Sequence, residues 1–341
     1  MAGIHILRTG LQTTIQDRGR FGYRGLGVSV CGALDRLSHD LANALVGNLP
    51  EAASLEMTLV GDDLKFSEPA VIALTGAKVS AMVHTEDGEL RALEMNRPCR
   101  VPARAVIRTG AIREGARTYL AVSGGINVPI VLGSRSTDLR SGFGGFGGQM
   151  LQQGWELAVG DAVHPQFRSA ISELKNCDSV SQSGWFSRPA SLCHETPAVV
   201  RVVAGQRFGF LTSDSQKLFL GERFTVSSQS NRMGYRLDGP ELKLTRTESL
   251  VSEGVAIGTI QLPPDGHPIL LMHDCAPTGG YPRIAHVITA DLPLAAQVCP
   301  GEALQFRLTS SSEAVQACRE QQVAVNRTRQ MIRLKLASDF Y

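Results

Sequence analysis

The part of the sequence richest in groups that could bind a ligand is residues 230–239, which read S-N-R-M-G-Y-R-L-D-G. Two guanidinium groups, Arg232 and Arg236, stand there beside the amide of Asn231 and the phenol of Tyr235. A guanidinium pairs with a carboxylate or phosphate through parallel hydrogen bonds. Side chains alternate along a strand, so the two arginines are expected on one face, opposite the amide and the phenol. The pattern predicts a cationic pocket, or else a half-exposed strand with solvated arginines.

A second group of polar residues, 273–283, reads H-D-C-A-P-T-G-G-Y-P-R and follows the apolar run 269–272. Asp274 at the end of this run could act as a base or orient an arginine. Gly279-Gly280 would let backbone amides approach a ligand closely. Further hydrogen-bond donors come from Thr278, Tyr281 and Arg283. A tight turn without any ligand would use the same glycines and prolines, so both interpretations stay open.

A third, weaker cluster consists of Gln16, Asp17 and Arg20 near the N-terminus. It overlaps a partial copy of the first stretch, because R-F-G-Y-R at 20–24 aligns with R-M-G-Y-R at 232–236. The chain is therefore expected to be internally duplicated. A surface turn would also account for the cluster.

Glycine is concentrated in residues 133–149, G-S-R-S-T-D-L-R-S-G-F-G-G-F-G-G-Q. Such a run gives access to positive φ angles and favours a loop over a regular element. It lacks the G-K-[ST] ending of a Walker-type phosphate loop and the strand-to-helix context of a dinucleotide fingerprint. An anion cradle, a structural bend and a contact between subunits are all compatible with it.

Metal and thiol chemistry are not expected. His267, His273 and His286 surround Cys275, but their spacing matches no recognised ligand pattern, and neither H-E-x-x-H nor C-x-x-C occurs. Nothing in the sequence supplies an imidazole partner that would activate Cys275 as a nucleophile.

The elements that must position these residues are mostly strands. One helix is expected after Asp35, a preferred N-cap residue, with Leu37, Leu41 and Leu45 at helical spacing and Gly47-Asn48 at its end. Beyond it, apolar residues alternate, and Gly and Pro recur at close to the roughly 8–12-residue intervals of all-β domains.

The length of 341 residues exceeds the roughly 100–200 residues of one domain, so two domains are expected. We place an N-terminal domain at 1–170, a Ser-rich junction at 171–197, a C-terminal domain at 198–310 and a tail at 311–341, in which residues 313–329 could form a helix.

The composition of the chain excludes some classes of binding partner. The 34 Lys+Arg and 32 Asp+Glu nearly balance and form no basic block, which argues against nucleic acid and an anionic membrane surface. The seven cysteines are scattered and odd in number, which favours a reducing compartment. No signal peptide or membrane span is recognisable, so a soluble cytoplasmic protein that binds small molecules or other proteins is expected.

Six motifs in order along residues 4–308 resemble the KipA family, also called allophanate hydrolase subunit 2 or the C subunit of 5-oxoprolinase, and related to part of the carboxyltransferase domain of urea carboxylase. The motifs are T-x-Q-D-x-G-R-x-G-Y-R-x-L-G-V (14–28), G-A-L-D with L-A-N-x-L-V-G-N (32–48), G-S-R-S-T-D (133–138), S-N-R-M-G-Y-R-L-D-G (230–239), S-E-G (252–254) and T-G-G-Y-P-R (278–283).

The resemblance implies a mainly β chain of two tandem cyclophilin-like β-barrel domains with a few short helices. It also implies a hetero-oligomer with a KipI-like B subunit and a lactam-handling A subunit, which together open 5-oxoproline to glutamate with ATP. ATP is expected mainly on a partner. The relation to urea carboxylase implies an alternative, biotin-dependent carboxyl transfer, but no biotin-accepting Met-Lys-Met motif occurs, so biotin would arrive on a separate carrier.

On this basis we assign substrate binding to the stretch 230–239 and the T-G-G motif, and catalysis to the residues around them. The substrate-binding set is Asn231, Arg232, Tyr235, Arg236, Thr278, Gly279 and Gly280. The catalytic set is Asp274, Tyr281 and Arg283. The identity of the base and the activity of the isolated chain stay open.

One departure from the family pattern lies inside the site. The family commonly reads D-R-Q-T-x-G-G-Y-P where this chain has D-C-A-P-T-G-G-Y-P at 274–282, so Cys275 and Ala276 replace an arginine and a glutamine. The change is compatible with an altered substrate. It is also compatible with a non-catalytic relative that binds a KipI-like protein in a regulatory role.

Overall fold

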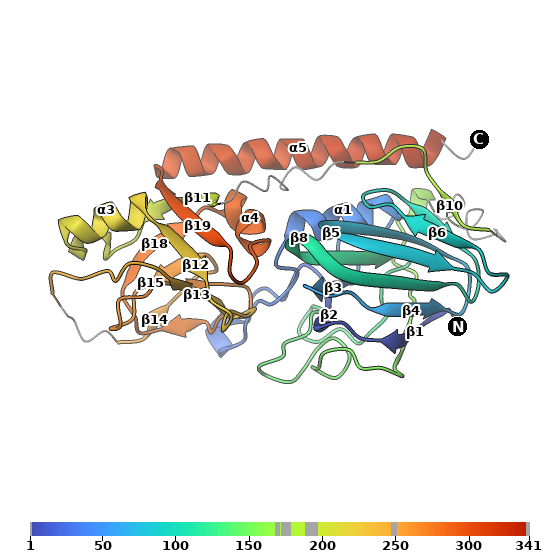
Figure 1. Ribbon diagram of the computed structural model, residues 1–341, viewed down its shortest axis with the longest axis horizontal. Helices are drawn as coiled ribbons and strands as arrows, with labels where there is room; N and C mark the ends of the chain where they lie inside the picture. Colours follow the sequence, from blue (N-terminus) through green and yellow to red (C-terminus); the bar gives the residue numbers. More distant parts are fainter. Residues whose placement is uncertain (1, 168–170, 172–178, 188–196, 247–250, 339–341) are drawn as a thin grey trace. The chain divides into compact units, whose positions relative to one another are not determined.

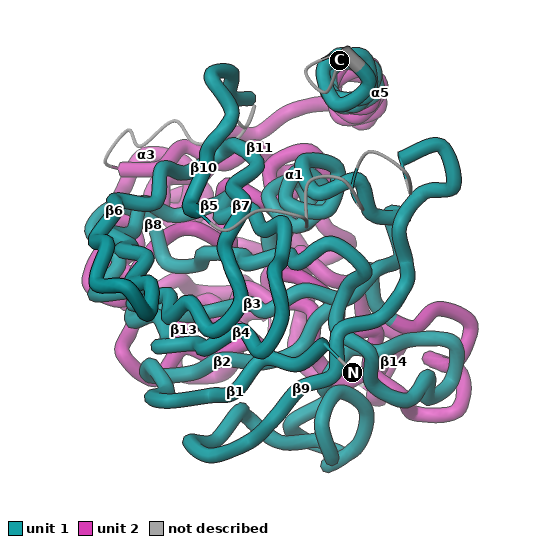
Figure 2. Tube along the Cα trace, turned by 90° about the vertical axis from the view of Figure 1, so that its right-hand side faces the viewer, with its two compact units in different colours: residues 1–19, 35–192, 324–341 teal, residues 20–34, 193–323 magenta. Residues whose placement is uncertain are grey.

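The computed structural model describes residues 2–167, 171, 179–187, 197–246 and 251–338. It divides into two compact units, which we treat separately (Figure 2): unit 1 comprises residues 1–19, 35–192 and 324–341, and unit 2 comprises residues 20–34 and 193–323. A short segment from near the N-terminus thus belongs to unit 2. The domain boundaries stay predictions, and much of the junction expected at 171–197 lies outside the described residues.

Unit 1 is built on a ten-stranded sheet (Figure 1). Its main path runs β10-β7-β5-β8-β4-β1-β9, with β2 and β3 paired beside β8 and β6 paired with β5. The strands are β1 (Gly3–Arg8), β2 (Gln12–Gln16), β3 (Ser54–Thr58), β4 (Asp63–Phe66), β5 (Ala70–His84), β6 (Leu90–Leu93), β7 (Cys99–Val101), β8 (Val106–Val122), β9 (Glu156–Ala158) and β10 (Ser181–Gln182).

Helix α1 (Arg36–Leu45) contacts β5 and β8 of this sheet (Figure 1). The predicted cap is confirmed: a carboxylate oxygen of Asp35 accepts the Ser38 N–H at 3.0 Å. Leu41 and Leu45 are buried, as their helical spacing requires.

The glycine-rich loop of unit 1 is anchored on the buried carboxylate of Asp17. That carboxylate accepts hydrogen bonds from Ser134 Oγ at 2.7 Å, from the Arg135 N–H at 2.6 Å and from Ser136 Oγ. The amide and hydroxyl groups that could have cradled a phosphate therefore already bind an anion of the protein itself. This arrangement favours the structural interpretation of the loop.

Replacing Asp17 with Asn is expected to destabilise unit 1. Burial opposes ionisation of Asp17, but the hydrogen bonds from Ser136, Ser134 and backbone amides outweigh it and lower its pKa. The ionised group thus stabilises the fold above the ordinary carboxyl pKa, and this stabilisation is lost as pH falls through the lowered pKa. The variant should lose about 2 kcal/mol at pH 7, because it leaves buried donors unpaired.

Urea unfolding between pH 7 and pH 3 measures this effect. The wild-type free energy of unfolding should fall with pH more steeply than that of the Asp17→Asn variant. Asp161→Asn, at an exposed position of the same unit, is the matched control. Equal stability of wild type and Asp17→Asn at pH 7 would contradict the anchoring role.

The described part of unit 2 forms a closed barrel in the order β11-β18-β15-β16-β13-β12-β19. Its strands are β11 (Ala198–Ala204), β12 (Arg223–Val226), β13 (Gly234–Asp238), β15 (Thr259–Gln261), β16 (Ile269–Leu271), β18 (Arg283–Val287) and β19 (Ala303–Leu308). A two-stranded ribbon, β14 (Glu253–Gly254) with β17 (Thr278–Gly279), adjoins it. The mainly β fold predicted from the sequence is confirmed, with a closed barrel in unit 2 and a branched sheet in unit 1.

Aromatic packing fills one part of the barrel core. Phe219 stacks on Phe306 with ring centroids 4.7 Å apart, and Phe224 lies 5.7 Å from the same ring. Phe219 belongs to α3 (Ser213–Gly221), which is capped by Thr212, whose side chain accepts the Ser215 N–H.

Helix α4 (Leu292–Ala296) lies near β11, and α5 (Ser311–Ser338) follows the last strand. The predicted tail helix thus exists and is longer than the expected 313–329. Ser310 and Glu313 form a reciprocal capping box at its start, and the hydrogen bonds from Ser310 and Thr309 lower the pKa of Glu313 to about 2. No helix in the described residues, α5 included, is long and apolar enough to cross a membrane.

Candidate functional site

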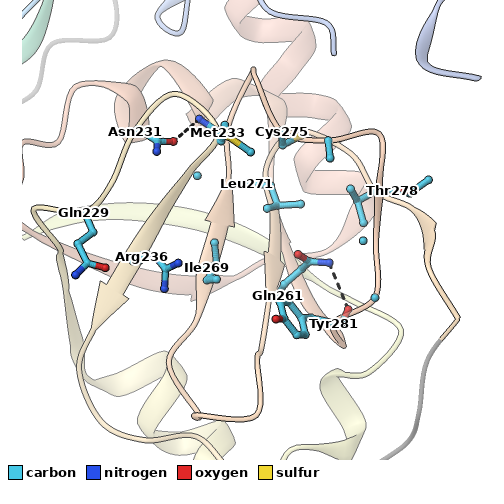
Figure 3. A pocket seen from close by; sticks show the side chains of 15 residues that line it. Gln229, Asn231, Met233, Arg236, Gln261, Ile269, Leu271, Cys275, Thr278 and Tyr281 are labelled. Carbon is cyan, nitrogen blue, oxygen red and sulfur yellow. Dashed lines mark hydrogen bonds between the residues drawn. The ribbon is translucent and has the colours of Figure 1, made fainter. Parts of the chain in front are cut away.

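The candidate site is a pocket of about 390 Å³ on the outer face of the unit 2 barrel (Figure 3). Its floor is formed by β13, β16 and β15, which are neighbours in the barrel. Strand alternation explains which side chains reach it: Tyr235 and Leu270 point into the core, so their neighbours point outward. The lining residues are Gln229, Asn231, Met233, Gly234, Arg236, Val255, Gln261, Ile269, Leu271, Cys275, Ala276, Thr278, Gly279, Gly280 and Tyr281.

Three floor residues form a row across the strands. Arg236 is directly opposite Ile269 in the β13–β16 pair, and Ile269 is directly opposite Gln261 in the β15–β16 pair. Two strand spacings separate the ends of the row, or roughly 10 Å between backbones. The pocket therefore holds a guanidinium and a carboxamide on either side of an apolar side chain.

The turn before β13 turns Arg232 away from this floor. Residues 231–233 form a turn closed by a bridge between Asn231 and Gly234, and β13 starts only at Gly234. Strand alternation does not extend into the turn. The expectation that Arg232 and Arg236 share one face is therefore wrong.

Arg232 instead forms a buried ion pair with Asp274. Its Nε and Nη2 donate to the two carboxylate oxygens, each at 2.9 Å, and the two side chains are only 2% and 3% exposed. Nη2 also donates to the Gly32 carbonyl at 2.7 Å. The pair thereby joins the segment 20–34, the turn before β13 and the loop after β16, all within unit 2.

The segment 20–34 also forms hydrogen bonds to the loop after β16. Residues 275–281 of this loop lie along the pocket, and we call them its cover. Arg24 donates to the carbonyl oxygen of Val255 and, at 3.4 Å, to that of Pro277. Ser29 Oγ donates to the Cys275 carbonyl at 3.1 Å. Side chains from near the N-terminus thus hold the first part of this loop and the neighbouring residue Val255.

Six residues predicted for the site line the pocket together: Asn231, Arg236, Thr278, Gly279, Gly280 and Tyr281. Four others do not line it: Arg232, Asp274, Tyr235 and Arg283. The Tyr235 hydroxyl points inward and donates to the Ala296 carbonyl at 3.3 Å. Arg283 lies beside the pocket, where it donates to Gln206 and pairs with Glu253. Their contacts account for these four residues without a ligand, and their roles in binding or catalysis stay predictions.

The third predicted cluster does not line the pocket either. Gln16 and Asp17 belong to unit 1 and Arg20 to unit 2, and all three are buried. Gln16 Nε2 donates to the Thr137 carbonyl at 3.3 Å. Gln16 and Asp17 therefore hold the glycine-rich loop of unit 1.

Sequence reasoning missed several lining residues, above all Gln261. It lies on a strand of three residues inside an apolar run, so nothing in the sequence separated its side chain from its core neighbours. Gln229 and Val255 were missed because the loops that bring them to the pocket come from distant parts of the chain, and Leu271 because it ends an apolar strand.

The pocket is weakly charged. Of the described residues that line it, Arg236 alone carries a full charge. Burial raises the pKa of the Cys275 thiol, against an opposing effect of Arg24, so Cys275 is a neutral wall residue at pH 7. Within the described residues no group of three His, Cys, Asp or Glu side chains could hold a metal ion. The arrangement suits a small ligand with one negative charge and neutral hydrogen-bonding groups.

The fold is that of urea carboxylase carboxyltransferase proteins. The crystal structure of Kluyveromyces lactis urea amidolyase matches 96% of this chain with a TM-score of 0.82 and 28% identity, and this chain spans 20% of that protein's length. The family described as carboxyltransferase domain, subdomain A and B, matches residues 26–308, and the chain belongs to this family.

Several named proteins are similar in sequence to nearly the whole of this chain. The C subunit of 5-oxoprolinase from Escherichia coli (strain K12) is 38% identical over 319 residues, which cover 94% of this chain and 95% of that protein. The protein of the same name from Haemophilus influenzae is 33% identical over 96% of this chain and 98% of its own length. The urea amidolyase of Lachancea kluyveri is 31% identical over 93% of this chain, which covers 17% of that protein.

Removing Arg232 is expected to unfold unit 2 and not merely to weaken ligand binding. Arg232→Ala leaves the Asp274 carboxylate buried without its partner, which should cost about 3–5 kcal/mol. The double variant Arg232→Met with Asp274→Leu, which removes both charges, should recover much of this loss. The free energies of unfolding of the wild type, of Arg232→Ala and of the double variant are measured in urea and compared. A stable Arg232→Ala protein that had lost only ligand binding would contradict this expectation and would support the predicted substrate role.

Proposed function

We propose that this protein is the C subunit of an ATP-dependent 5-oxoprolinase and that its pocket holds 5-oxoproline. The observation that carries the proposal is the placement of Arg236 and a set of neutral hydrogen-bonding groups around an apolar floor. A five-membered lactam with one carboxylate has this combination of chemistry. Similarity along nearly the whole chain to two proteins named as the C subunit of 5-oxoprolinase supports the same conclusion.

In this proposal the lining residues bind and orient the lactam. Arg236 pairs with the carboxylate, as a guanidinium does well. The hydroxyl groups of Thr278 and Tyr281 and the amides of Gly279-Gly280 polarise the lactam carbonyl, which amide resonance makes a poor electrophile. The ion pair of Arg232 with Asp274 acts by positioning the turn and the loop that carry these groups.

Partner subunits complete the proposed enzyme. A KipI-like B subunit and a lactam-handling A subunit would contribute the remaining chemistry, and ATP would bind mainly on a partner. The sequence supports this division, because it contains no phosphate-binding loop of recognised type.

A second candidate function is carboxyl transfer from biotin on a separate carrier protein to a urea-like acceptor. It is favoured by the family to which the chain belongs and by the similarity to fungal urea amidolyases. It requires biotin carboxylase and carrier proteins, whereas the oxoprolinase proposal requires neither.

The decisive assay is 5-oxoproline-dependent ATP hydrolysis by this chain reconstituted with its cognate A and B subunits, each omitted in turn. Turnover should need all three. Arg236→Gln should raise KM on the order of 10-fold to 100-fold, because a charged hydrogen bond to the carboxylate is lost. Arg223→Gln, at an exposed arginine of β12 away from the pocket, is the matched control. Full turnover without this chain would refute the proposal.

A further inference from the structure

Gln261 is held in one position by its surroundings. It is 5% exposed, and its neighbour Ile260 points into the barrel core, which turns the Gln261 side chain to the pocket. Gly279 packs against this side chain, because a Cβ there would lie 2.5 Å from Gln261 Nε2 and would displace the carboxamide. In the structure the carboxamide is part of the pocket floor (Figure 3).

The carboxamide of Gln261 has unused hydrogen-bonding capacity. Among the described residues it makes one long hydrogen bond, from Nε2 to the Tyr281 carbonyl oxygen at 3.4 Å. A carboxamide offers two N–H donors and an oxygen that accepts two hydrogen bonds. Neither amide atom of Gln261 is among the buried, unpaired side-chain atoms of the described residues, so its open hydrogen-bonding positions face the pocket. A ligand in the pocket can occupy these positions.

The shape of a carboxamide decides which ligand completes it. Its donor and acceptor lie side by side on one edge, so it pairs best with a group that presents an acceptor and a donor on one edge too. A ring forces this cis arrangement on the N–H and C=O of a lactam or a cyclic urea. An open-chain secondary amide is trans and presents the two groups on opposite edges.

We propose that Gln261 is the specificity-determining residue of the pocket and recognises the cis N–H and C=O edge of a cyclic amide or cyclic urea. The row across the floor supports the assignment: Arg236 and Gln261 stand on either side of Ile269, so a ligand over Ile269 can meet both. Arg236 selects the carboxylate and Gln261 selects the ring amide.

This inference rests on the proposed function for the choice of 5-oxoproline as the preferred ligand, but its chemistry is shared with the ureido ring of biotin. Four probes separate the contributions: 5-oxoproline, L-proline, which lacks the ring carbonyl, 2-pyrrolidinone, which lacks the carboxylate, and biotin. Dissociation constants are measured by ligand-observed NMR with the full chain, alone and together with its A and B subunits.

Gln261→Met keeps the length of the side chain and removes both hydrogen bonds. It should weaken 5-oxoproline binding on the order of 10-fold to 100-fold and L-proline binding by much less, because proline has no ring carbonyl to accept from the carboxamide and so cannot form the paired hydrogen bonds. Arg236→Met should show the complementary pattern, with 2-pyrrolidinone binding unchanged. Gln305→Met, at a glutamine of β19 outside the pocket, controls for the substitution itself.

Several outcomes would overturn the inference. Equal weakening of 5-oxoproline and proline by Gln261→Met would mean that the residue acts only through packing. Absence of cyclic-amide binding by the wild-type chain, alone and in the complex, would also refute it. Preferred binding of biotin that depends on Gln261, without 5-oxoproline turnover, would sustain the inference and refute the oxoprolinase proposal. Turnover of 5-oxoproline with a KM that Gln261→Met leaves unchanged would refute the inference and sustain the oxoprolinase proposal.

Discussion

The ion pair between Arg232 and Asp274 is the interaction on which the arrangement of unit 2 depends most. It is almost fully excluded from solvent, and its guanidinium also binds the Gly32 carbonyl. Burying two charges is costly unless their geometry and remaining hydrogen bonds compensate. Here the compensation comes from three chain segments that are far apart in sequence, so the pair is satisfied only when all three are in place. We infer that it specifies the position of the pocket walls more than it adds to stability.

The side chains of the pocket floor and those of its cover are held in position by different interactions. The floor side chains come from barrel strands whose opposite faces are locked in the core, as Tyr235 and Leu270 are. The cover is a loop held by hydrogen bonds from Arg24 and Ser29. A strand holds a side chain more rigidly than a loop does. Selectivity is therefore expected to come from the floor, and adaptation to different ligands from the cover.

Sequence periodicity predicted the mainly β fold and the helix after Asp35, because alternation and capping are local signals. Residue types also picked out two stretches, 230–239 and 273–283, that both contribute residues to the pocket. It failed at Arg232, where a turn of three residues interrupts the alternation that the argument assumed. It also missed Gln261, whose importance depends on strand pairing with Ile269 and on the space left by Gly279. Such facts depend on contacts between distant segments, which one sequence does not reveal. The internal copy was informative in one respect: Arg20, the counterpart of Arg232, is also buried.

The departure at Cys275-Ala276 can now be interpreted in physical terms. Both residues line the pocket, where the pattern that this chain otherwise resembles carries an arginine and a glutamine. A neutral thiol and a methyl group remove one positive charge and one carboxamide from the cover, and they leave more room. The pocket retains an arginine and a glutamine nonetheless, but on the floor, as Arg236 and Gln261. The pair of functional groups suited to a carboxylated cyclic amide is thus kept on rigid strands, and the loss from the cover is compatible with a functional site.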